Sequence, residues 1–570
     1  MGELRGALRR DTCRVRALEA PRWTFALCAL TVLAALLSLI FILDYTKYPD
    51  PQWRLLIFPY LLREQDLAGN ALILAIALGA YLPQTRSAAL DLIDALSRHP
   101  WRVAGASFVA LCVAVLVVAH NHPLAGDEHL AVFQSRAFAA GQLAGQFPRD
   151  LIAQLIPPHY QGRWLIASDA TGAVAAVYWP GFALLLAPFS LIGAPWACNP
   201  LLASLSLVLM AKLAARLTGN AQAGGWAMLF ALGSPAFTGM ALSYFSMSAH
   251  LCLNLLFAWL VLKGGARSLA AAGVVGSFAL VLSNPVPHAL FALPWILWLR
   301  RRDLLALAAG YVPLALVLGL GWWLFLRELQ GPLFVVPYPP DGDPLHRAGN
   351  LIWYLLLELR TAFSFLGEET ILRRLSEQVR LWGWAVPGLP LLALAGWWLH
   401  RGVTGLRLLG WSLFATLLGY LFVSFDQGYG WGARYVHPAW GALPILASSA
   451  MVSLRADAGG ARLLSYAARM AVLSLMFATA LRFFQIHLFM DEQLSLRPPY
   501  EKGVRQVVFI TPVFEYYLQD FVQNDPFLRE PVIFMTSHGY RRDSTYVIQR
   551  RFPGARLTYI GPEGSVWRLD

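Results

Sequence analysis

The chain has 570 residues, of which 57% are hydrophobic and 14% charged, and its mean hydropathy is +0.53. These values lie outside the usual range of soluble globular proteins and indicate a polytopic membrane protein. The net charge of +12 does not indicate nucleic-acid binding, because the basic residues are sorted between membrane loops instead of gathering on one soluble face. The five cysteines show no CxxC spacing, so neither a zinc site nor a disulfide framework is expected.

The first apolar run follows the arginine-rich residues 1–22 and lacks a small-residue cleavage pattern, so we expect it to remain as a membrane anchor. A spanning helix needs about 20 mostly apolar residues, and by this criterion the chain should cross the membrane about thirteen times. The predicted spans are residues 23–43, 67–82, 101–119, 199–216, 223–241, 247–262, 268–283, 286–299, 304–326, 381–399, 406–424, 434–453 and 463–487.

Lys and Arg accumulate in the short cytoplasmic loops of membrane proteins. If the N-terminus is cytoplasmic, every predicted inside segment is basic, including the run from Arg300 to Arg302. The long segments 120–198 and 327–380 and the tail from about 489 then lie outside. Residues 174–193 are long enough to span, but Pro180 and Pro188 favour a broken, interfacial helix pair. Function is therefore expected on the outer face.

The tail alternates strand-like apolar runs with helical periodicity and with Pro, Gly and Asn breaks; examples are RQVVFIT, PVIFMTS and ARLTYIG. We therefore expect a polytopic α-helical membrane protein with a small outer α/β domain. Residues 1–100 should form an N-terminal cytoplasmic segment with two extra spans. Residues 101–488 should form the main membrane module, with large outer loops at 120–198 and 327–380, and residues 489–570 the α/β domain.

Two adjacent carboxylates, Asp127 and Glu128, lie shortly after the predicted span 101–119, in the run HNHPLAGDEHL. One explanation is structural, because acidic residues at a helix N-terminus satisfy free N–H groups and offset the helix dipole, typically by about 0.5–2 kcal/mol. The other is chemical, because a carboxylate beside apolar surface at the membrane boundary can take a proton from a hydroxyl group. The sequence leaves both explanations open.

Three runs carry a resemblance to a known family: GDEHLAVFQSRAFAAGQL, VYWPGFALLLAPFSLIGAPWACNPLLASLSLVLMAKLAARLTG and GYGWGARYVHPAWGALP. They resemble the C-type (GT-C) integral-membrane glycosyltransferases, especially the bacterial relatives of protein O-mannosyltransferases and lipid A aminoarabinose transferases. The resemblance covers about residues 101–488, and the tail is similar to the C-terminal domains of bacterial members. An acidic pair in the first large outer loop is the hallmark of the family, and Asp127 and Glu128 match it as the catalytic residues.

The resemblance implies an inverting transfer of a single sugar from a polyprenyl-phosphate donor to a hydroxyl of a glycan, lipid or protein acceptor. Asp127 would be the base, and the reaction would take place on the outer face of a bacterial inner membrane. Negative charge develops on the departing phosphate, and the planar fork of arginine binds phosphate oxygens in pairs. The outer-face candidates for this role are Arg136, Arg163, Arg360 and Arg434.

Arg434 is the favoured phosphate ligand, because Arg434, Tyr435 and Pro438 match the family's Arg-aromatic-x-x-Pro pattern. An arginine that snorkels at the membrane interface is the alternative. Family members often carry a lysine before the prolines of the first outer loop, where this chain has Tyr178 and Trp179. That phosphate ligand is therefore absent here or comes from another segment.

Histidines and tyrosines near the outer ends of spans are further candidates. Tyr178, Tyr435, His250 and His288 are predicted to line a substrate cavity, since polar side chains at membrane depth are costly unless they serve a function. The histidines of HNH and His129 match no metal-ligand spacing, so we assign them hydrogen-bonding or interfacial roles and no metal site. No cofactor is indicated, and a divalent metal is left open.

Other functions compete with glycosyl transfer. A transporter or lipid flippase would show inverted repeats or charged residues in mid-span. An enzyme of the O-antigen-ligase or polymerase type would transfer an oligosaccharide, and a non-catalytic assembly protein would be built around the tail. For the transferase, the expected partners are the lipid-linked donor, the acceptor and membrane lipids.

Overall fold

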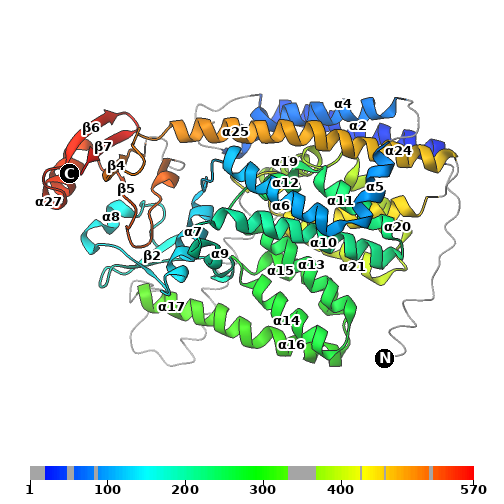
Figure 1. The fold of residues 1–570 in the computed structure, drawn as a ribbon, viewed down its shortest axis with the longest axis horizontal. Helices are drawn as coiled ribbons and strands as arrows, with labels where there is room; N and C mark the ends of the chain where they lie inside the picture. Colours follow the sequence, from blue (N-terminus) through cyan, green and yellow to red (C-terminus); the bar gives the residue numbers. More distant parts are fainter. Residues whose placement is uncertain are drawn as a thin grey trace.

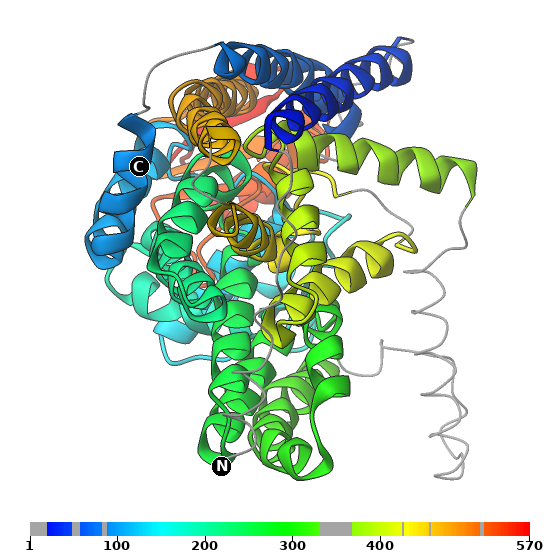
Figure 2. The same cartoon turned by 90° about the vertical axis from the view of Figure 1, so that its right-hand side faces the viewer.

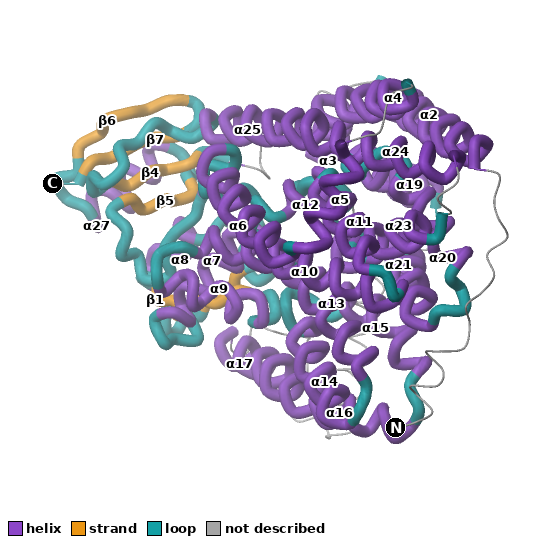
Figure 3. The backbone as a smooth tube through the Cα atoms, turned by 45° about the vertical axis from the view of Figure 1, so that its right-hand side comes forward, coloured by secondary structure: helices purple, strands orange, loops and turns teal. Residues whose placement is uncertain are grey.

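The computed structural model of the protein describes residues 20–47, 57–82, 88–330, 367–423, 427–454, 458–512 and 518–569. These residues form a large bundle of helices with a smaller part at one end, and Figure 3 shows that the described strands gather there. We call this end of the molecule the outer end, after the topology expected from the sequence. The sheet of the C-terminal residues lies at its tip (Figure 1). The predicted fold class, a helical membrane-type protein with a small C-terminal α/β domain, is confirmed.

The helices of the N-terminal half begin with α2 and end with α15. Their bounds are α2 Ala20–Tyr45, α3 Ile57–Leu61, α4 Leu67–Tyr81, α5 Ala88–Arg98, α6 Pro100–Val117, α7 Gly126–Ala139, α8 Ile152–Leu155, α9 Gly181–Leu191, α10 Cys198–Thr218, α11 Ala221–Leu232, α12 Pro235–Met240, α13 Met247–Lys263, α14 Ala266–Leu280 and α15 Val286–Trp298.

The later helices include two long rods that contain a π-helical turn. Their bounds are α16 Arg301–Ala315, α17 Gly321–Gln330, α19 Glu368–Gly383, α20 Leu389–Leu399, α21 Thr404–Tyr420, α22 His437–Trp440, α23 Ala442–Val452, α24 Ala458–Leu473, α25 Thr479–Ser495, α26 Tyr540–Arg542 and α27 Gln549–Arg551.

Among the described residues, five helices are long and apolar enough to cross a membrane: Arg22–Tyr45, Pro100–Val117, Pro195–Thr218, Arg301–Leu329 and Gly459–Ser495. Each coincides with a predicted span. Several other predicted spans are broken into shorter helices, because Gly and Pro interrupt them. The span expected at 223–241 becomes α11 and α12, with Gly233 and Pro235 at the break, and the span expected at 434–453 becomes α22 and α23.

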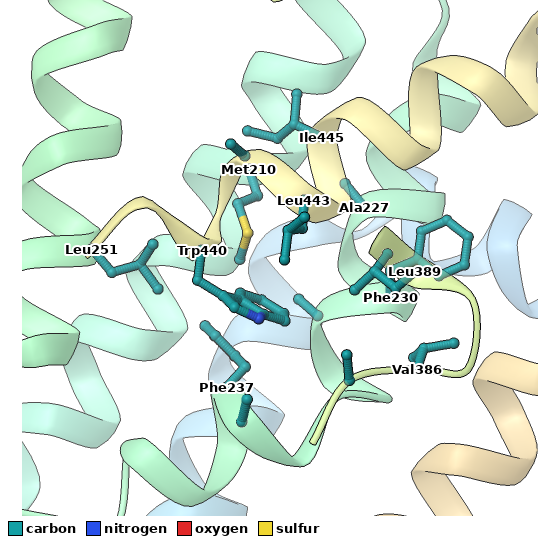
Figure 4. Packing of buried hydrophobic residues seen from close by; sticks show 14 of the residues in the cluster. Met210, Ala227, Phe230, Phe237, Leu251, Val386, Leu389, Trp440, Leu443 and Ile445 are labelled. Carbon is teal, nitrogen blue, oxygen red and sulfur yellow. The ribbon is translucent and has the colours of Figure 1, made fainter. Parts of the chain in front are cut away.

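The core of the bundle is formed by helices that are apolar on all sides, as is typical of helices buried in a bundle or a membrane. Met210, Phe230 and Trp440 converge there from α10, α11 and α22 (Figure 4), and each is at most 1% exposed. Helices α20 and α23 pack closely, since a Cβ on Gly396 would overlap the carbonyl oxygen of Leu446. Small residues permit such close approach between membrane helices.

Helix α19 was not predicted, because its many charges placed residues 368–380 in the second outer loop. Figure 2 views the bundle from the end opposite the sheet and shows α19, in yellow-green, lying crosswise to helices seen nearly end-on. The predicted span 381–399 is accordingly interrupted. Its first residues end α19, and α20 begins at Leu389 after Gly388, whose φ of +73° lies in the left-handed region.

Part of the first outer loop forms a small antiparallel sheet at the outer end, with strand order β1-β3-β2. The strands are β1 Gly145–Gln146, β2 Leu165–Ala167 and β3 Ala173–Ala176. The prediction of a helix pair at 174–193 was therefore wrong. The segment starts as β3, and one helix, α9, begins directly after Pro180, a favourable position for proline because its fixed φ suits a helix start.

The C-terminal sheet packs onto this loop. Its strands are β4 Gln506–Ile510, β5 Val532–Thr536, β6 Arg556–Gly561 and β7 Gly564–Arg568, in the order β5-β4-β7-β6. β4 pairs parallel with β5 and antiparallel with β7, and all five of its residues are buried. Successive side chains of a strand point to opposite faces. Phe509 thus joins Phe133 and Phe147 of the first outer loop, while Val508 packs with Phe521 on the other face.

Candidate active site at the outer end

Helix α7 begins at Gly126, and the adjacent carboxylates Asp127 and Glu128 lie in its first turn. Their side chains have different partners. Glu128 is 3% exposed. One of its oxygens accepts hydrogen bonds from the backbone N–H groups of Leu124 (2.9 Å) and Ala125 (3.2 Å), and the other accepts from the N–H of Tyr244 (2.6 Å). Donors at a helix start otherwise lack partners, so Glu128 caps α7 and ties it to the connection between α12 and α13.

These contacts account for Glu128 structurally and do not support the expectation that it is a catalytic residue. Both of its oxygens face backbone donors and the side chain is buried, so it does not present an oxygen to an acceptor. Burial raises the pKa of Glu128 to about 7, although the three N–H donors oppose this shift. Of the two explanations given for the pair, the structural one applies to Glu128.

Asp127 has different partners. Its Oδ1 accepts a hydrogen bond from the Tyr178 hydroxyl at 2.9 Å, and its Oδ2 lies 3.1 Å from Nη1 of Arg434. The Asp127 side chain is 20% exposed and the Arg434 side chain 10%. The fold thus brings together three residues that the sequence nominated separately, from segments 51 and 307 positions away along the chain. We call Asp127, Tyr178 and Arg434 the acidic triad.

Arg434 is held by the short segment that precedes it. The side chain of Gln427 accepts a hydrogen bond from the Arg434 backbone N–H at 2.8 Å and donates to the Gly432 carbonyl at 2.8 Å. The guanidinium carbon lies 4.4 Å from the centre of the Phe245 ring, within the range of a cation–π contact. Within the described part of the chain, Nε of Arg434 has no hydrogen-bond partner. One donor of the guanidinium is therefore left unsatisfied by the described residues, and this donor is buried.

Tyr178 and Tyr435 were both predicted to line a cavity; Tyr178 is a member of the triad, and Tyr435 follows Arg434 in the chain. The indole N–H of Trp322 donates to the Tyr178 carbonyl at 2.9 Å, and the Tyr178 ring meets Trp164 edge to face. Burial, together with the Asp127 carboxylate, raises the pKa of Tyr178, so its hydroxyl stays protonated and can donate. The ring of Tyr435 stacks on Tyr420 with centroids 4.8 Å apart.

A third carboxylate, Asp520, was not singled out from the sequence. It lies in the 3-10 turn Leu518–Phe521 of the C-terminal part, is 5% exposed, and accepts hydrogen bonds from the Tyr160 hydroxyl and from the backbone of Gly126. A Cβ on Gly126 would overlap the Tyr160 hydroxyl. Burial, with smaller contributions from Asp127 and Glu128, raises the pKa of Asp520 to about 8. The C-terminal part therefore contacts the start of the helix that carries Asp127.

The other arginine candidates do not join the triad. Nη1 of Arg136 pairs with Glu530 at 2.6 Å, with the two side chains 35% and 49% exposed, and Arg163 is exposed in the turn before β2. Arg136 thus forms an ion pair with the C-terminal part, and nothing in this position supports the expected role in phosphate binding. Arg360 falls outside the described residues.

His250 and His288 are buried in the bundle, on α13 and α15. His288 contacts Asn254 through Nδ1 (2.6 Å) and Tyr311 through Nε2. Asn254 in turn donates to the Pro438 carbonyl at 2.9 Å. These contacts connect neighbouring helices and do not involve the acidic triad, so the structure does not assign either histidine to the same site.

The acidic triad combines a partly exposed carboxylate, a phenolic donor and a guanidinium at the place where the bundle, the first outer loop and the C-terminal part meet. A carboxylate in such surroundings can accept a proton, and a guanidinium can stabilise a developing anion. The group is therefore suited to transfer from a donor with an anionic leaving group to a hydroxyl.

The chain is similar to known proteins at the level of three-dimensional structure. No protein-family model matches the chain, and neither does any curated protein. Solved structures that are similar include ArnT from Cupriavidus metallidurans bound to undecaprenyl phosphate, with 14% identity over 81% of this chain and 97% of that chain and a TM-score of 0.46. The apo form of the same protein is similar at 13% identity over 81% of this chain and 96% of that chain, with a TM-score of 0.45. This likeness concerns the fold alone.

Proposed function

We propose that the chain is an inverting glycosyltransferase of the GT-C type, which moves a single sugar from polyprenyl phosphate to a hydroxyl of a glycan, lipid or protein acceptor. The observation that carries the proposal is the acidic triad, in which one carboxylate is held between a phenolic hydroxyl and a guanidinium. The sequence resemblance of the runs around Asp127 and Arg434 supports the same assignment. The proposed location is the outer face of a bacterial inner membrane, with a cytoplasmic N-terminus.

In the proposed reaction, the acceptor hydroxyl gives its proton to Asp127 while its oxygen bonds to the anomeric carbon of the sugar. The bond between that carbon and the phosphate oxygen breaks, and polyprenyl phosphate leaves with the electron pair. A single displacement of this kind inverts the anomeric centre. Charge that grows on the phosphate needs preorganised donors in a site of low dielectric.

Arg434 is the proposed donor to this phosphate. Its buried guanidinium keeps Nε free of partners among the described residues, and one of its Nη atoms contacts Asp127. A planar fork with donors on several edges can contact a carboxylate with one edge and offer another edge to phosphate oxygens, a fixed geometry that a lysine lacks. Tyr178 is proposed to orient Asp127, so that the other lone pairs of the carboxylate face the acceptor.

A transporter or flippase is the second candidate, because one group of charges lies buried in the bundle. Asp66 pairs with Arg380 (3.0 Å) and Arg482 (3.0 Å), and all three are at most 1% exposed. Such charges often mark substrate pathways in membrane proteins. Here, however, Arg482 also donates to the carbonyls of residues 65 and 383, at 2.8 Å and 2.9 Å, so it links helices as a structural tie.

The test is to place the full chain in lipid nanodiscs with a panel of polyprenyl-phosphate monosaccharides and a crude extract of acceptors. Release of polyprenyl phosphate is measured with and without the extract. The transferase proposal predicts release that depends on both the acceptor and one class of sugar. Arg136→Ala serves as a matched control and should stay within about twofold of wild type, because exposed ion pairs contribute only about 0.2–1 kcal/mol. Donor translocation without release would support the transporter.

A further inference from the structure

A group of metal-ligand side chains lies at the outer end, apart from the acidic triad. His120 follows the end of α6, while His487 and Asp491 lie four residues apart on α25. One ligand atom from each residue can be chosen so that all three lie within 4.8 Å of one another. Hydrogen-bonding or interfacial roles were expected for three histidines of this segment. His122 stacks on Phe521 and His129 meets Phe133 edge to face, and of the three His120 alone belongs to the group.

The geometry of this group fits a cation between the ligands. Nε2 of His120 lies 2.7 Å from Oδ1 of Asp491, and Nε2 of His487 lies 3.4 Å from Oδ2. Two ligands of a tetrahedral zinc ion, each about 2.0–2.1 Å from the metal, are about 3.3 Å apart. The His487 contact matches this separation, and the His120 contact is shorter and would have to widen when the ion binds. Despite its short distance, the His120 contact lacks the angles of a hydrogen bond, and Nε2 has no hydrogen-bond partner among the described residues. Both imidazoles thus direct Nε2 at one carboxylate.

We propose that His120, His487 and Asp491 bind a divalent transition metal ion, with Zn²⁺ the best match. Two imidazole nitrogens and one carboxylate oxygen suit zinc, while magnesium and calcium prefer oxygen ligands alone. The side chains are 31%, 37% and 53% exposed in the order His120, His487 and Asp491, so water can occupy the fourth position and the ion can enter from solvent.

The position of the group on α25 places it outside the hydrocarbon layer. The continuous helix Gly459–Ser495 has 37 residues. At about 1.5 Å per residue it is about 55 Å long, far more than the roughly 30 Å core of a bilayer. Its outer end runs toward the C-terminal sheet (Figure 1), and we expect the last turns, with Asp491 beyond the predicted span 463–487 and His487 at its end, to project from the hydrocarbon layer.

The metal would fix the segment that leads to the acidic triad. His120 and Asn121 have φ values of +53° and +50°, in the left-handed region that His and Asn tolerate better than most residues. The side chain of Asn121 accepts a hydrogen bond from the Tyr244 hydroxyl, and the backbone N–H of Tyr244 donates to Glu128. A zinc ion at His120 would thus tie α25 to the cap of α7. The proposed role is structural, without part in the transfer.

The proposal is tested by zinc binding rather than by activity. The full chain, purified through a tag without histidines, is stripped with a chelator in nanodiscs and dialysed against Zn²⁺, and bound zinc is counted by elemental mass spectrometry. Wild type is compared with His487→Gln, Asp491→Asn and the double variant. His538→Gln is the matched control, since His538 is an exposed histidine of the same outer region.

We expect one zinc per wild-type chain, bound with micromolar or tighter affinity, and a rise in thermal unfolding temperature when zinc is added. Each ligand variant should bind at least about tenfold more weakly, because even the loss of a partner outside the ligand set typically costs 10–100-fold. The control should bind as wild type. Equal zinc contents in wild type and the double variant, or no stoichiometric zinc in wild type, would overturn the proposal. These readouts are independent of glycosyl transfer.

Discussion

The buried carboxyl of Asp520 should make the stability of the outer end depend on pH. Burial raises its pKa from 3.8 to about 8. Between pH 3.8 and pH 8 the Asp520 carboxyl keeps its proton in the folded chain but has released it in the unfolded chain. The stability that this proton contributes is therefore complete below pH 3.8 and is lost as pH rises through 8. Asp520→Asn removes the titration, and the variant should therefore gain stability relative to wild type as pH rises.

The magnitude follows from linkage. One pKa unit corresponds to about 1.36 kcal/mol, and the folded chain binds nearly one extra proton from pH 5.5 to 7.5. Over this range wild type should lose about 2.5 kcal/mol relative to Asp520→Asn. Hydrogen exchange of the α7 backbone amides, corrected for intrinsic rates at each pH, measures the free energy of opening where Asp520 contacts Gly126.

Asp525→Asn is the matched control in the same region. Burial raises the pKa of Asp525, but hydrogen bonds from Arg529 and from backbone N–H groups outweigh this effect and hold the pKa below its usual range. Asp525 is therefore ionised in both states from pH 5.5 to 7.5, and its variant should differ from wild type by a constant amount. If Asp520→Asn also differed by a constant amount over this range, the reasoning about its buried carboxyl would be refuted.

Two further variants test the acidic triad. Tyr178→Phe removes the hydroxyl that donates to Asp127 at 2.9 Å. Because hydrogen bonds to charged groups contribute about 1.5–3 kcal/mol, kcat/KM for polyprenyl phosphate release should fall about 10–150-fold. A fall below about threefold would contradict the orienting role. Arg434→Lys keeps the charge but loses the fork. We expect about a 100-fold or greater loss of kcat/KM in the same assay with an unchanged thermal unfolding temperature, and near-normal activity would leave Arg434 as an interfacial arginine.

The sequence identified features that depend on local pattern. Long apolar runs predicted the helices of spanning length, and alternation in the tail predicted the strands β4 to β7. Asp127 and Arg434 were nominated by motif and Tyr178 as a cavity residue, although nothing in the sequence indicated that Tyr178 and Arg434 would meet at Asp127. Helix α19 could have been found from its apolar residues at helical spacing, such as Ile371 and Leu375, but its charges suggested a loop.

Other features depend on contacts between distant segments and are not readable from local pattern. The adjacent Asp127 and Glu128 look equivalent in the sequence, yet the N–H of Tyr244, 116 positions away, helps to fix Glu128 as a cap. Asp520 meets Tyr160 across 360 positions, so its burial depends on how the C-terminal sheet docks. The histidines of HNH and His129 match no metal-ligand spacing, which argued against a metal site among residues close in sequence. His120 instead meets His487 and Asp491, which lie on the distant helix α25.

The central claim is that Asp127 takes the proton of the acceptor, and replacing it with Asn tests this most directly. Asn has the same shape and can still accept from the Tyr178 hydroxyl, but it removes the base and the charge opposite Arg434. With the sugar donor that wild type uses, the initial rate of acceptor-dependent polyprenyl phosphate release is compared between the two proteins at equal folded concentration. We expect a loss of at least about 100-fold, since a positioned base contributes about 10²–10⁴-fold. Equal rates in the two proteins would contradict the account and leave Asp127 with a structural role only.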